Sequence, residues 1–340
     1  MSTKYRKSDI DELHQIVNFF KECEPNTILT ESMYQWKYVY NPVGLSRVYF
    51  AEDENDTLVG VYSIIPWKFI VNEEIIEGYQ AVDIMVHPSQ RGKGTIVGLS
   101  KYIFEDLKTT TSPFILGFPN ERIYPIHLKV GWKSLGTFET YVKILRVNKY
   151  CKRLETKFTK PIFSIANNIL KTIDSLRCLF YNDLELYEAS DFSRLGESFQ
   201  KYNAGDMKTL RSQQYLKWRY IDKPENKYHI YLLCEKGKPQ CYIVTIEDLN
   251  EVTIVDLIAS TRKVIIPALN IISNHFRKDP LKSSVRCACH SDLSHALKRS
   301  FFIHRNVKWP IIIYNIDNGV LNSSIDTFTW HILGGDIEVL

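Results

Sequence analysis

The chain has 340 residues, which predicts two domains at roughly 150 residues per domain. Apolar residues make up 44% of it and charged residues 24%, so the chain can bury a sizeable core and is not a disordered protein. Its net charge of +4 at pH 7 is too small for a protein that coats nucleic acid, and we expect no nucleic-acid partner.

The cysteines and the apolar runs exclude further classes of protein. The seven cysteines include no Cys-x-x-Cys pair, and Cys287 and Cys289 lack further ligands at zinc-site spacing, which predicts free thiols and no metal. Free thiols are typical of the reducing cytoplasm, where we expect the protein. The apolar runs fall short of the roughly 18 residues that span a bilayer, and the polar start Met1–Lys7 is unlike a signal peptide. We therefore expect no membrane partner.

The first 90 residues alternate strand and helix patterns. A short strand is predicted at Lys4–Lys7, and Ser8 is predicted to cap a helix whose apolar residues recur from Leu13 to Phe20. Runs rich in β-branched and aromatic residues then predict strands at Arg47–Glu52, Leu58–Trp67, Phe69–Val71 and Glu77–Val86.

The most informative segment joins a strand to a helix through a loop with two glycines. Ala81–Val86 is an apolar strand, Arg91-Gly92-Lys93-Gly94 follows, and Ile96, Leu99, Ile103 and Leu107 mark one face of a helix. The first-turn amides of a helix have no intrahelical acceptor, so this arrangement forms an anion site. Neither the Walker pattern nor the dinucleotide fingerprint is present, which disfavours NTP and NAD.

Two further segments follow this helix. Pro113–Asn120 is predicted to be a strand that ends at an asparagine, and Gly131-Trp132 stands eleven residues after that asparagine. A basic stretch from Lys149 to Lys160 then precedes an amphipathic run from Ile162 to Phe180. We interpret 149–183 as a linker and a bracing helix, because the basic stretch lacks the interleaved aromatic residues of a nucleic-acid arm.

The second half of the chain repeats the first at an offset of 182 residues. Eight identities fall within 8–49, where chance on average composition gives about two or three. The matched pairs are Ser8/Ser190, Asp9/Asp191, Leu13/Leu195, Thr27/Thr209, Trp36/Trp218, Tyr38/Tyr220, Pro42/Pro224 and Tyr49/Tyr231. Strands are predicted at Glu185–Ala189, Tyr228–Cys234, Gln240–Glu247 and Glu251–Ala259, in the same rhythm as the first half. The repeat predicts a duplicated fold.

The segment Val86-His87-Pro88-Ser89-Gln90-Arg91-Gly92-Lys93-Gly94 resembles motif A of the GCN5-related N-acetyltransferase (GNAT) superfamily. In that family the pattern [Q/R]-x-x-G-x-[G/A] binds the pyrophosphate of acetyl-CoA through backbone amides. The resemblance implies that Arg91, Gly92, Lys93, Gly94 and Thr95 bind acetyl-CoA as co-substrate, and that the main chain of Met85 and Val86 faces the thioester. Ile96 departs from the family, which has Gly or Ala there mainly to pack the helix closely.

The segment Pro113–Asn120 with Gly131-Trp132 resembles motif B of the same superfamily, in which a tyrosine four residues before a Gly-aromatic pair is the general acid. Here that position is His127, and Tyr124 lies one turn earlier. The resemblance implies a cofactor-binding role for Asn120 and an acid role for either His127 or Tyr124. Plain packing is the alternative interpretation of both side chains.

Amide formation from a thioester needs a neutral amine, and therefore a base. Asp83 is the only carboxylate on the strand before the loop, where GNAT enzymes often place the base, and we predict that role for it. His87 is the alternative base. A structural role for Asp83 also fits, because Asp256 stands at the corresponding place in the second copy.

In the second copy, Arg262–Pro267 stands where the phosphate loop is expected. Its β-branched residues and proline cannot form a glycine-rich anion site, so this copy is predicted not to bind CoA and to close over the acceptor site instead. The predicted fold is α+β, with two tandem GNAT-like domains whose mixed, mostly antiparallel sheets are flanked by helices. The predicted parts are a catalytic domain at 1–148, the linker and helix at 149–183 and a degenerate domain at 184–340.

The resemblance implies an acetyl-CoA-dependent N-acetyltransferase acting on a small polar amine, with an amino sugar or nucleotide-linked amino sugar of surface-polysaccharide synthesis as the favoured acceptor. The alternatives are an aminoacyl-tRNA-dependent transferase, disfavoured by the mild charge, and a CoA-binding sensor without activity. The oligomeric state stays open between monomer and homodimer.

Overall fold

The computed structural model describes residues 3–25, 27, 30–110, 112–150, 154, 156–196, 206–225, 227–290, 293–316 and 329–337. The chain forms two compact units, each drawn from three segments. Unit 1 comprises Met1–Thr137, Asp222–Glu225 and Trp309–Phe328, and unit 2 comprises Phe138–Ile221, Asn226–Lys308 and Thr329–Leu340. The units are interleaved along the chain, whereas the predicted parts 1–148, 149–183 and 184–340 were contiguous.

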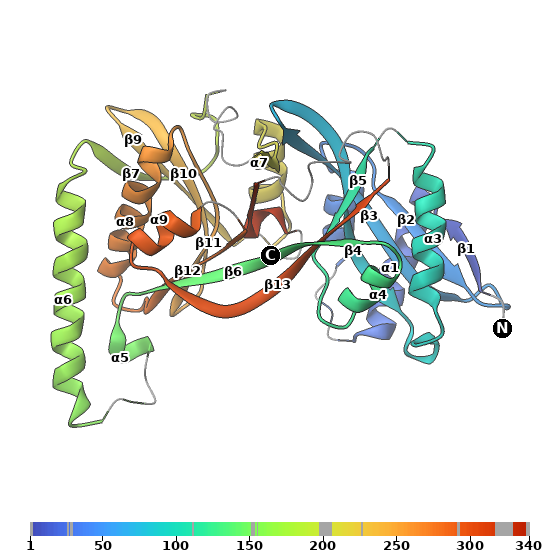
Figure 1. Ribbon diagram of the computed structural model, residues 1–340, viewed down its shortest axis with the longest axis horizontal. Helices are drawn as coiled ribbons and strands as arrows, with labels where there is room; N and C mark the ends of the chain where they lie inside the picture. Colours follow the sequence, from blue (N-terminus) through green and yellow to red (C-terminus); the bar gives the residue numbers. More distant parts are fainter. Residues whose placement is uncertain are drawn as a thin grey trace. The chain divides into compact units, whose positions relative to one another are not determined.

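Unit 1 is built on a mixed sheet with the strand order β1-β2-β3-β4-β5-β13 (Figure 1). The strands are β1 Lys4–Lys7, β2 Arg47–Glu52, β3 Leu58–Val71, β4 Glu74–Val86, β5 Phe114–Gly117 and β13 Ile303–Asn315. Neighbours are antiparallel except β4 and β5, which are parallel. A mixed, mostly antiparallel sheet was the prediction, and it is confirmed.

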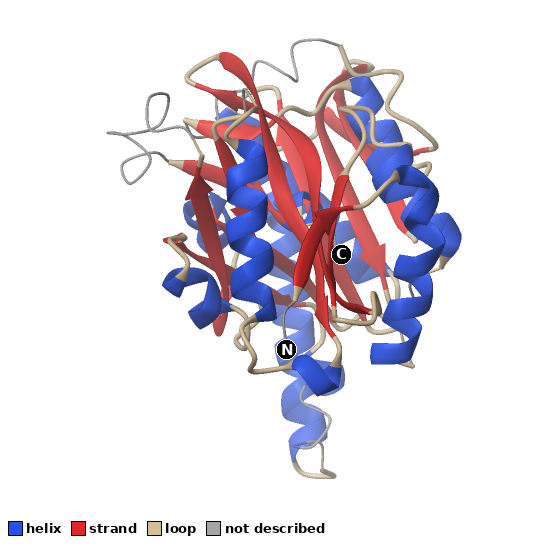
Figure 2. Cartoon of the chain, turned by 90° about the vertical axis from the view of Figure 1, so that its right-hand side faces the viewer, coloured by secondary structure: helices blue, strands red, loops and turns tan. Residues whose placement is uncertain are grey.

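Helices flank this sheet (Figure 2). They are α1 Leu13–Cys23, α2 Glu31–Tyr34, α3 Thr95–Leu107 and α4 Tyr124–Lys129, together with a π-helical turn at Gln35–Val39 and short 3₁₀ turns at Ile10–Glu12 and Pro88–Gln90. The predicted apolar face of α3 is buried at Leu99, Ile103 and Leu107, which join the core cluster of unit 1. The parallel pair β4 and β5 needs a crossover connection, and α3 supplies it.

Two local predictions differ from the structure. The two predicted strands that end at Val71 form the single strand β3. Ser8 does not cap the first helix, which begins after a 3₁₀ turn with Glu12 at the cap position. The Glu12 carboxylate instead accepts from the Asp9 amide at 2.7 Å and pairs with the Arg6 guanidinium, so the Ser8 prediction is wrong.

Helix α3 approaches the sheet closely because a glycine lies at the contact on each side, Gly98 on the helix and Gly60 on the sheet. A Cβ on Gly98 would overlap the hydroxyl of Tyr5 on β1, and a Cβ on Gly60 of β3 would stand 2.9 Å from Thr95 Cγ2. Contacts this short leave no room for a side chain. Ile96, which departs from the family pattern, is only half-buried. The close packing of the helix therefore depends on Gly60 and Gly98.

Unit 2 has the strand order β7-β9-β10-β11-β12-β6. The strands are β6 Lys133–Ile144, β7 Leu184–Ala189, β8 Met207–Thr209, β9 Tyr228–Glu235, β10 Lys238–Glu247, β11 Glu251–Ala259, β12 Ser284–His290 and β14 Trp330–Leu333. The helices are α5 Val147–Tyr150, α6 Thr159–Leu179, α7 Gln213–Tyr220, α8 Arg262–Lys278 and α9 Leu293–Arg299, followed by a 3₁₀ turn at Gly334–Asp336. In this strand order β11 and β12 are the parallel pair, and α8 joins them.

The two units therefore have matching sheets with the last strands exchanged. In unit 1, β5 pairs with Ile312–Asn315 of β13, which comes from the end of the second half of the chain. In unit 2, β12 pairs with Glu139–Ile144 of β6, which follows the first half. The exchange pairs the sides of β5 and β12 that would otherwise be open sheet edges.

Candidate functional site

The sheet of unit 1 is open between β4 and β5 near the end of β4. Strands β4 and β5 pair only from Tyr79 to Ala81 among the described residues, because β5 ends at Gly117. Strand β4 continues to Val86, paired with β3 on its other side. The backbone after Ala81 thus keeps one side available for a ligand. Met85 and Val86, the predicted contacts of the thioester, lie in this segment.

Asp83 lies at a β-bulge in this open segment. The register between β3 and β4 shifts by one residue after Val61, so β4 carries one extra residue there. Asp83 has φ of +46°, in the left-handed region. That conformation costs a non-glycine residue about 1–3 kcal/mol and is concentrated at functional sites. The strained backbone at the bulge therefore favours a functional role for Asp83 by an observation that is independent of its chemistry.

The Asp83 carboxylate is held by two side chains from the π-helical turn. Lys37 Nζ lies 2.7 Å from Asp83 Oδ2, and the Tyr38 hydroxyl lies 2.5 Å from the same oxygen and 3.0 Å from Ser63 Oγ. The Lys37 side chain is 2% exposed and that of Asp83 10%. Burial, reinforced by the Asp83 charge, raises the pKa of Tyr38 well above its usual value, so the phenol stays a donor. Both contacts use Oδ2.

The predicted phosphate loop has the backbone that an anion site requires. Gly92 and Gly94 have φ of +79° and +86°, and a Cβ on either would have no neighbour within 4 Å. Glycine is therefore needed for the backbone conformation and not for space. Gly94 caps α3, and the first intrahelical bond runs from the Gly98 amide to the Gly94 carbonyl at 3.0 Å.

The amides of Thr95, Ile96 and Val97 precede that bond and point out of the helix end. Arg91 Nε donates to the Val86 carbonyl at 3.3 Å, which ties the loop to the end of β4. Lys93 is exposed beside it. The loop thus combines a helix N-terminus with two cations, as an anionic ligand needs.

His87, the alternative base, is occupied in a local cap. Its Nδ1 accepts from the Ser89 amide at 3.3 Å and lies 2.7 Å from Ser89 Oγ, at the start of the turn Pro88–Gln90. Its Nε2 lies 3.5 Å from a Glu22 carboxylate oxygen. These contacts give His87 a structural function at the strand end.

His127 is buried at 2% exposure on α4, between the rings of Tyr62 and Trp132. The Tyr62 hydroxyl lies 2.9 Å from His127 Nε2. Burial lowers the pKa of His127 to about 4, so the imidazole is neutral at pH 7. Burial also raises the pKa of Tyr62, so both members of this hydrogen-bonded pair are neutral at pH 7.

Tyr124 is the first residue of α4 and is half-buried against the core of unit 1. Asn120 sets the turn before it. The side-chain oxygen of Asn120 accepts from the amides of Arg122 and Ile123 at 3.0 and 3.1 Å, and its carbonyl accepts from the Tyr124 amide. Asn120 thus positions Tyr124. The sequence analysis predicted a cofactor contact for Asn120 and did not predict this positioning role.

Lys37, Tyr38 and Ser63 were missed as site residues by the sequence analysis. Lys37 and Tyr38 lie far from Asp83 in the sequence, and Tyr38 was noted only as a matched residue of the repeat. The signal was present in the repeat itself, since both Tyr38 and Asp83 have counterparts in the second half of the chain. In unit 2 the counterpart Tyr220 donates to Asp256 at 2.8 Å.

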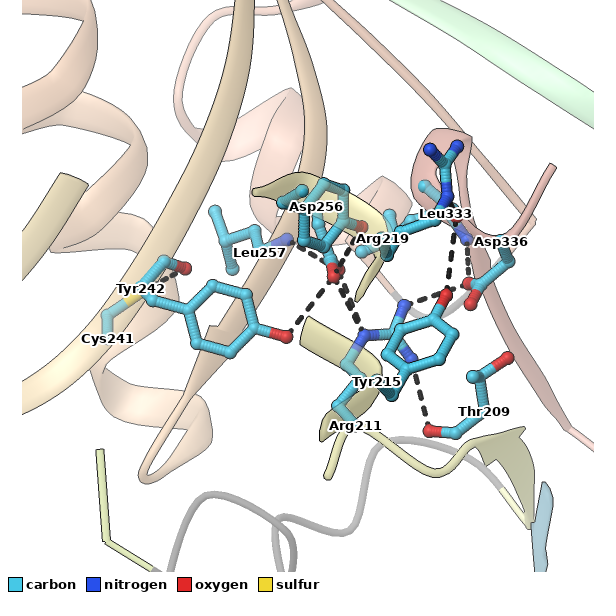
Figure 3. Close-up of polar contacts among 12 residues, drawn as sticks. Thr209, Arg211, Tyr215, Arg219, Cys241, Tyr242, Asp256, Leu257, Leu333 and Asp336 are labelled. Carbon is cyan, nitrogen blue, oxygen red and sulfur yellow. Dashed lines mark hydrogen bonds and ion pairs between the residues drawn. The ribbon is translucent and has the colours of Figure 1, made fainter. Parts of the chain in front are cut away.

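In unit 2, Asp256 and its polar partners form a cluster that is buried. Figure 3 shows the contacts of this cluster. Arg211 Nε lies 2.9 Å from Asp256 Oδ2, and the Tyr242 hydroxyl donates to the same oxygen at 3.2 Å. Arg211 also pairs with Asp336 at 2.9 Å. The same Tyr–Asp pair is therefore embedded in a core in unit 2, whereas in unit 1 it lies at the open end of β4.

The C-terminal segment fills the corresponding opening in unit 2. Strands β11 and β12 pair only as far as Ile254 and Cys287, and beyond that point β12 pairs with β14. Arg219 donates to the carbonyls of Gly335 and Ile337 at 3.0 and 2.9 Å. Helix α8 begins at Arg262, immediately after β11, and the segment predicted to replace the glycine loop is its first turns.

The comparisons with known proteins agree with this geometry. The acetyltransferase (GNAT) domain family matches residues 4–135. A probable N-acyltransferase from Enterococcus faecalis has a similar structure, with a TM-score of 0.64 and 11% identity over 93% of this chain and 73% of that one. A GCN5-related N-acetyltransferase from Anabaena variabilis has a TM-score of 0.63 and 13% identity over the same shares.

A third similar structure is N-myristoyltransferase from Saccharomyces cerevisiae with bound myristoyl-CoA. It has a TM-score of 0.59 and 12% identity over 92% of this chain and 79% of that one. Comparison with curated protein sequences gave no significant match. At these identities the structural likeness establishes the fold and nothing finer.

The open end of β4 and the glycine loop both lie within residues 4–135, the part of the chain that the family model matches. These residues form a domain of the acetyltransferase (GNAT) family.

Proposed function

We propose that unit 1 transfers an acetyl group from acetyl-CoA to the primary amine of a small polar acceptor. The observation that carries the proposal is that β4, the two glycines with left-handed backbone and the N-terminus of α3 follow one another directly in the chain. An extended pantetheine arm fits along the open side of Val82–Val86, and the pyrophosphate fits the amides after Gly94. The loop residues Arg91, Gly92, Lys93, Gly94 and Thr95 bind the cofactor in this proposal.

In the proposed reaction Asp83 accepts a proton from the acceptor ammonium through Oδ1. Lys37 and Tyr38 hold Oδ2, which fixes the carboxylate in one orientation. The neutral amine then attacks the thioester carbonyl, and main-chain amides near Met85 and Val86 stabilise the oxyanion. Collapse of the tetrahedral intermediate releases the CoA thiolate and forms the amide.

Tyr124 is the acid that the geometry favours. A group that protonates the thiolate must reach the site, and His127 is buried in the core with its Nε2 hydrogen-bonded to Tyr62. Tyr124 retains an exposed part at the start of α4, which Asn120 positions. We therefore assign the acid role to Tyr124 and a packing role to His127.

The acceptor in this proposal is an amino sugar or a nucleotide-linked amino sugar. Such a diphosphate needs cations, and Arg122 and Lys129 are exposed on and beside α4. Arg47 is a further cation of unit 1, but it is paired with Asp106 at 2.9 Å and is less available. The exposed cations Arg122 and Lys129 therefore support this acceptor class.

One observation favours a second candidate, a protein that binds CoA without transferring its acyl group. Asp83 Oδ2 is already held by Lys37 Nζ at 2.7 Å and by the Tyr38 hydroxyl at 2.5 Å, so the carboxylate has a structural function in the folded chain. In that case the phosphate loop binds CoA and no amine is acetylated.

Calorimetric titration of acetyl-CoA, followed by a transfer assay on a panel of amines, separates these candidates. We expect one site per chain, and acetylation of an amino sugar or nucleotide-linked amino sugar. Binding without acetylation of any amine supports the second candidate.

The variant Gly94→Val tests the loop. Valine cannot adopt φ of +86° without strain, so we expect at least a tenfold loss of acetyl-CoA affinity. Gly237→Val is the matched control, because Gly237 has φ of +76° and an added Cβ would have no neighbour within 4 Å, but the residue lies in the β9–β10 turn. Equal affinity of the two variants would show that the loop does not bind the cofactor.

A further inference from the structure

Trp309, on strand β13, differs from the other tryptophans of the chain in its exposure to solvent. Its side chain is 41% exposed, whereas the other five tryptophans are each at most 5% exposed. A single exposed apolar side chain is ordinary on a protein surface, so the meaning of this exposure depends on where the ring lies.

A hydrogen bond holds the indole of Trp309 at the end of β5. Trp309 Nε1 donates to the carbonyl of Phe118 at 3.2 Å, and Phe118 is the first residue after β5. An aromatic ring that is already held in one position loses little conformational freedom when a ligand packs against it. Trp309 is therefore preorganised as a contact surface.

The register of the sheet places Trp309 level with Asp83. Gly117, the last residue of β5, pairs with Ala81 of β4 on one side and with Ile312 of β13 on the other. Strand β4 is parallel to β5 and β13 is antiparallel, so Asp83 and Trp309 both lie beyond Gly117 at the same end of the sheet. Asp83 is two residues past this row and Trp309 three, so they flank the same opening.

Trp309 lies on the face of the sheet opposite α3. Ile312 and Tyr314 of β13 belong to the core cluster that contains Leu99 and Ile103 of α3. Side chains alternate between the two faces of a strand. Trp309 is three residues from Ile312 and therefore points to the other face.

Asp83 points to that same face. Tyr62 of β3 belongs to the core cluster beneath α3, so its neighbour Ser63 points away from α3. The Tyr38 hydroxyl lies 3.0 Å from Ser63 Oγ and 2.5 Å from Asp83 Oδ2. The Asp83 carboxylate and the Trp309 indole thus share one face of the sheet.

The separation of the two side chains suits a single six-membered ring. Neighbouring strands lie about 4.8 Å apart, so β4 and β13 are about 10 Å apart across β5. An amine bonded to Asp83 at about 3 Å and a ring packed on the indole at about 4 Å, together with the ring itself, occupy that span.

We propose that Trp309 determines acceptor specificity by packing its indole against the apolar face of a sugar ring whose amine lies at Asp83. The face of an indole carries negative charge and attracts C–H groups that neighbouring oxygens make slightly positive. An open-chain amine has no such face. The inference rests on the proposed acetyl transfer and narrows its acceptor to a hexosamine. Trp309 takes no part in proton transfer.

Calorimetric titration of the CoA-saturated chain tests the proposal without any need for turnover. The probes are glucosamine, UDP-glucosamine and the open-chain 2-amino-2-deoxyglucitol. We expect at least tenfold tighter binding of a ring-bearing probe than of the open-chain probe. Trp309→Ala should weaken binding of the ring-bearing probe at least tenfold and leave CoA affinity unchanged. Trp309→Phe keeps an aromatic face and should restore most of the lost affinity.

The matched control is Tyr102→Ala, which removes an aromatic side chain of similar exposure, 37%, from α3 on the other face of the sheet. It should bind each probe like the unaltered chain. Circular dichroism and the midpoint of thermal unfolding show that each variant is folded. Equal binding of the ring-bearing probes by Trp309→Ala and the control overturns the proposal, and so does the lack of binding of either ring-bearing probe.

The acetylation assay separates this inference from the proposed function. In that assay Trp309→Ala should raise the KM for the amine at least tenfold with little change in kcat, because the indole binds the ring and not the reacting atoms. Trp309-dependent binding of a sugar that is never acetylated supports the inference and contradicts the proposed transfer. Acetylation with an amine KM unchanged in Trp309→Ala supports the transfer and overturns the inference.

Discussion

Asp83 combines three properties that rarely occur together in one residue. Its backbone is left-handed, its side chain is paired with a buried lysine, and it lies in the part of β4 beyond the pairing with β5. The strain is sustained because Lys37 and Tyr38 both bind the displaced carboxylate. The site is therefore determined by contacts between the π-helical turn and the bulge, and not by Asp83 alone.

Asp83→Asn tests the base role at the residue scale. We expect kcat/KM for amine acetylation to fall at least about 100-fold, because a positioned base usually contributes that much, while acetyl-CoA affinity stays unchanged. Steady-state kinetics and calorimetry measure the two quantities. Asp56→Asn is the control, since Asp56 is also left-handed, with φ of +55°, but lies on an exposed turn. Unchanged kcat/KM in Asp83→Asn would remove the base assignment.

His127 makes stability depend on pH. Its pKa is lowered by burial to about 4 in the folded chain, whereas an unfolded chain has about 6.5. The unfolded state therefore binds more protons between these values, and the free energy of unfolding falls as pH drops from about 6.5 to about 4, by up to about 3 kcal/mol. This contribution is fully present above pH 6.5.

Urea unfolding as a function of pH checks this prediction with His127→Gln. The variant should lose the His127 part of the fall in stability, whereas His14→Gln, on the exposed surface of α1, should keep it. Parallel pH profiles for His127→Gln and the unaltered chain would contradict the assignment.

At the scale of elements, α3 is positioned by glycines on itself and on the sheet. Gly98 touches the Tyr5 ring and Gly60 touches Thr95, so the helix N-terminus comes close to the end of β4. The loop that contains Gly92 and Gly94 joins β4 to α3 within a few residues, so its conformation depends on how closely the helix approaches the sheet. A helix held further from the sheet would move the amides after Gly94 away from the open side of β4.

Gly98→Ala tests the packing of this helix. The added methyl group meets the Tyr5 ring, and we expect a loss of about 1–3 kcal/mol in the free energy of unfolding. Tyr5→Ala removes the opposing ring, so Gly98→Ala should cost less in that background. Denaturant unfolding of the double-mutant cycle measures the coupling. Additive losses would show that Tyr5 does not limit the approach of α3.

At the scale of the whole molecule, the two units have the same order of strands but differ at the openings between their parallel strands, β4 and β5 in unit 1 and β11 and β12 in unit 2. Unit 1 keeps the opening between its parallel strands and has a glycine loop after β4. Unit 2 fills the same opening with β14 and buries its aspartate in an ion cluster. Only unit 1 therefore has the features of a cofactor site among the described residues.

Arg211→Met tests the buried cluster of unit 2. It leaves Asp256 and Asp336 without their cation, and we expect a loss of about 3–5 kcal/mol in the free energy of unfolding. Arg286→Met is the control, because Arg286 pairs with Glu251 at the surface and should cost about 1 kcal/mol or less. Thermal and urea unfolding measure both. Similar losses in the two variants would contradict a structural role for the cluster.

Local chemistry was predicted well from the sequence, because it depends on neighbours in the chain. The strand at Ala81–Val86, the glycine loop and the helix after it were all found, and the left-handed conformations of Gly92 and Gly94 explain why glycines stand there. The sequence has no glycine loop before α8, and residues 262–267, which stand in its place, form the first turns of that helix. The predicted start of the first helix was wrong because a 3₁₀ turn at Ile10–Glu12 separates Ser8 from the helix, and the Glu12 carboxylate accepts from the Asp9 amide.

The partners of Asp83 came only from the structure. Lys37 and Tyr38 approach it through a bulge and a π-helical turn, and neither irregularity has a periodic signal in the sequence. The burial of His127 between Tyr62 and Trp132 likewise depends on packing. Sequence analysis left two acids open, and the tertiary contacts favour Tyr124.

The sequence by itself determined the class of chemistry and the presence of two similar halves, because glycine conformations, strand periodicity and repeats are local properties of the chain. Tertiary structure decided which strand completes each sheet, because β13 and β6 pair with partners far away in the sequence and no local preference specifies that exchange. It also decided that the C-terminal segment closes unit 2, because that closure depends on buried charges from three separate segments.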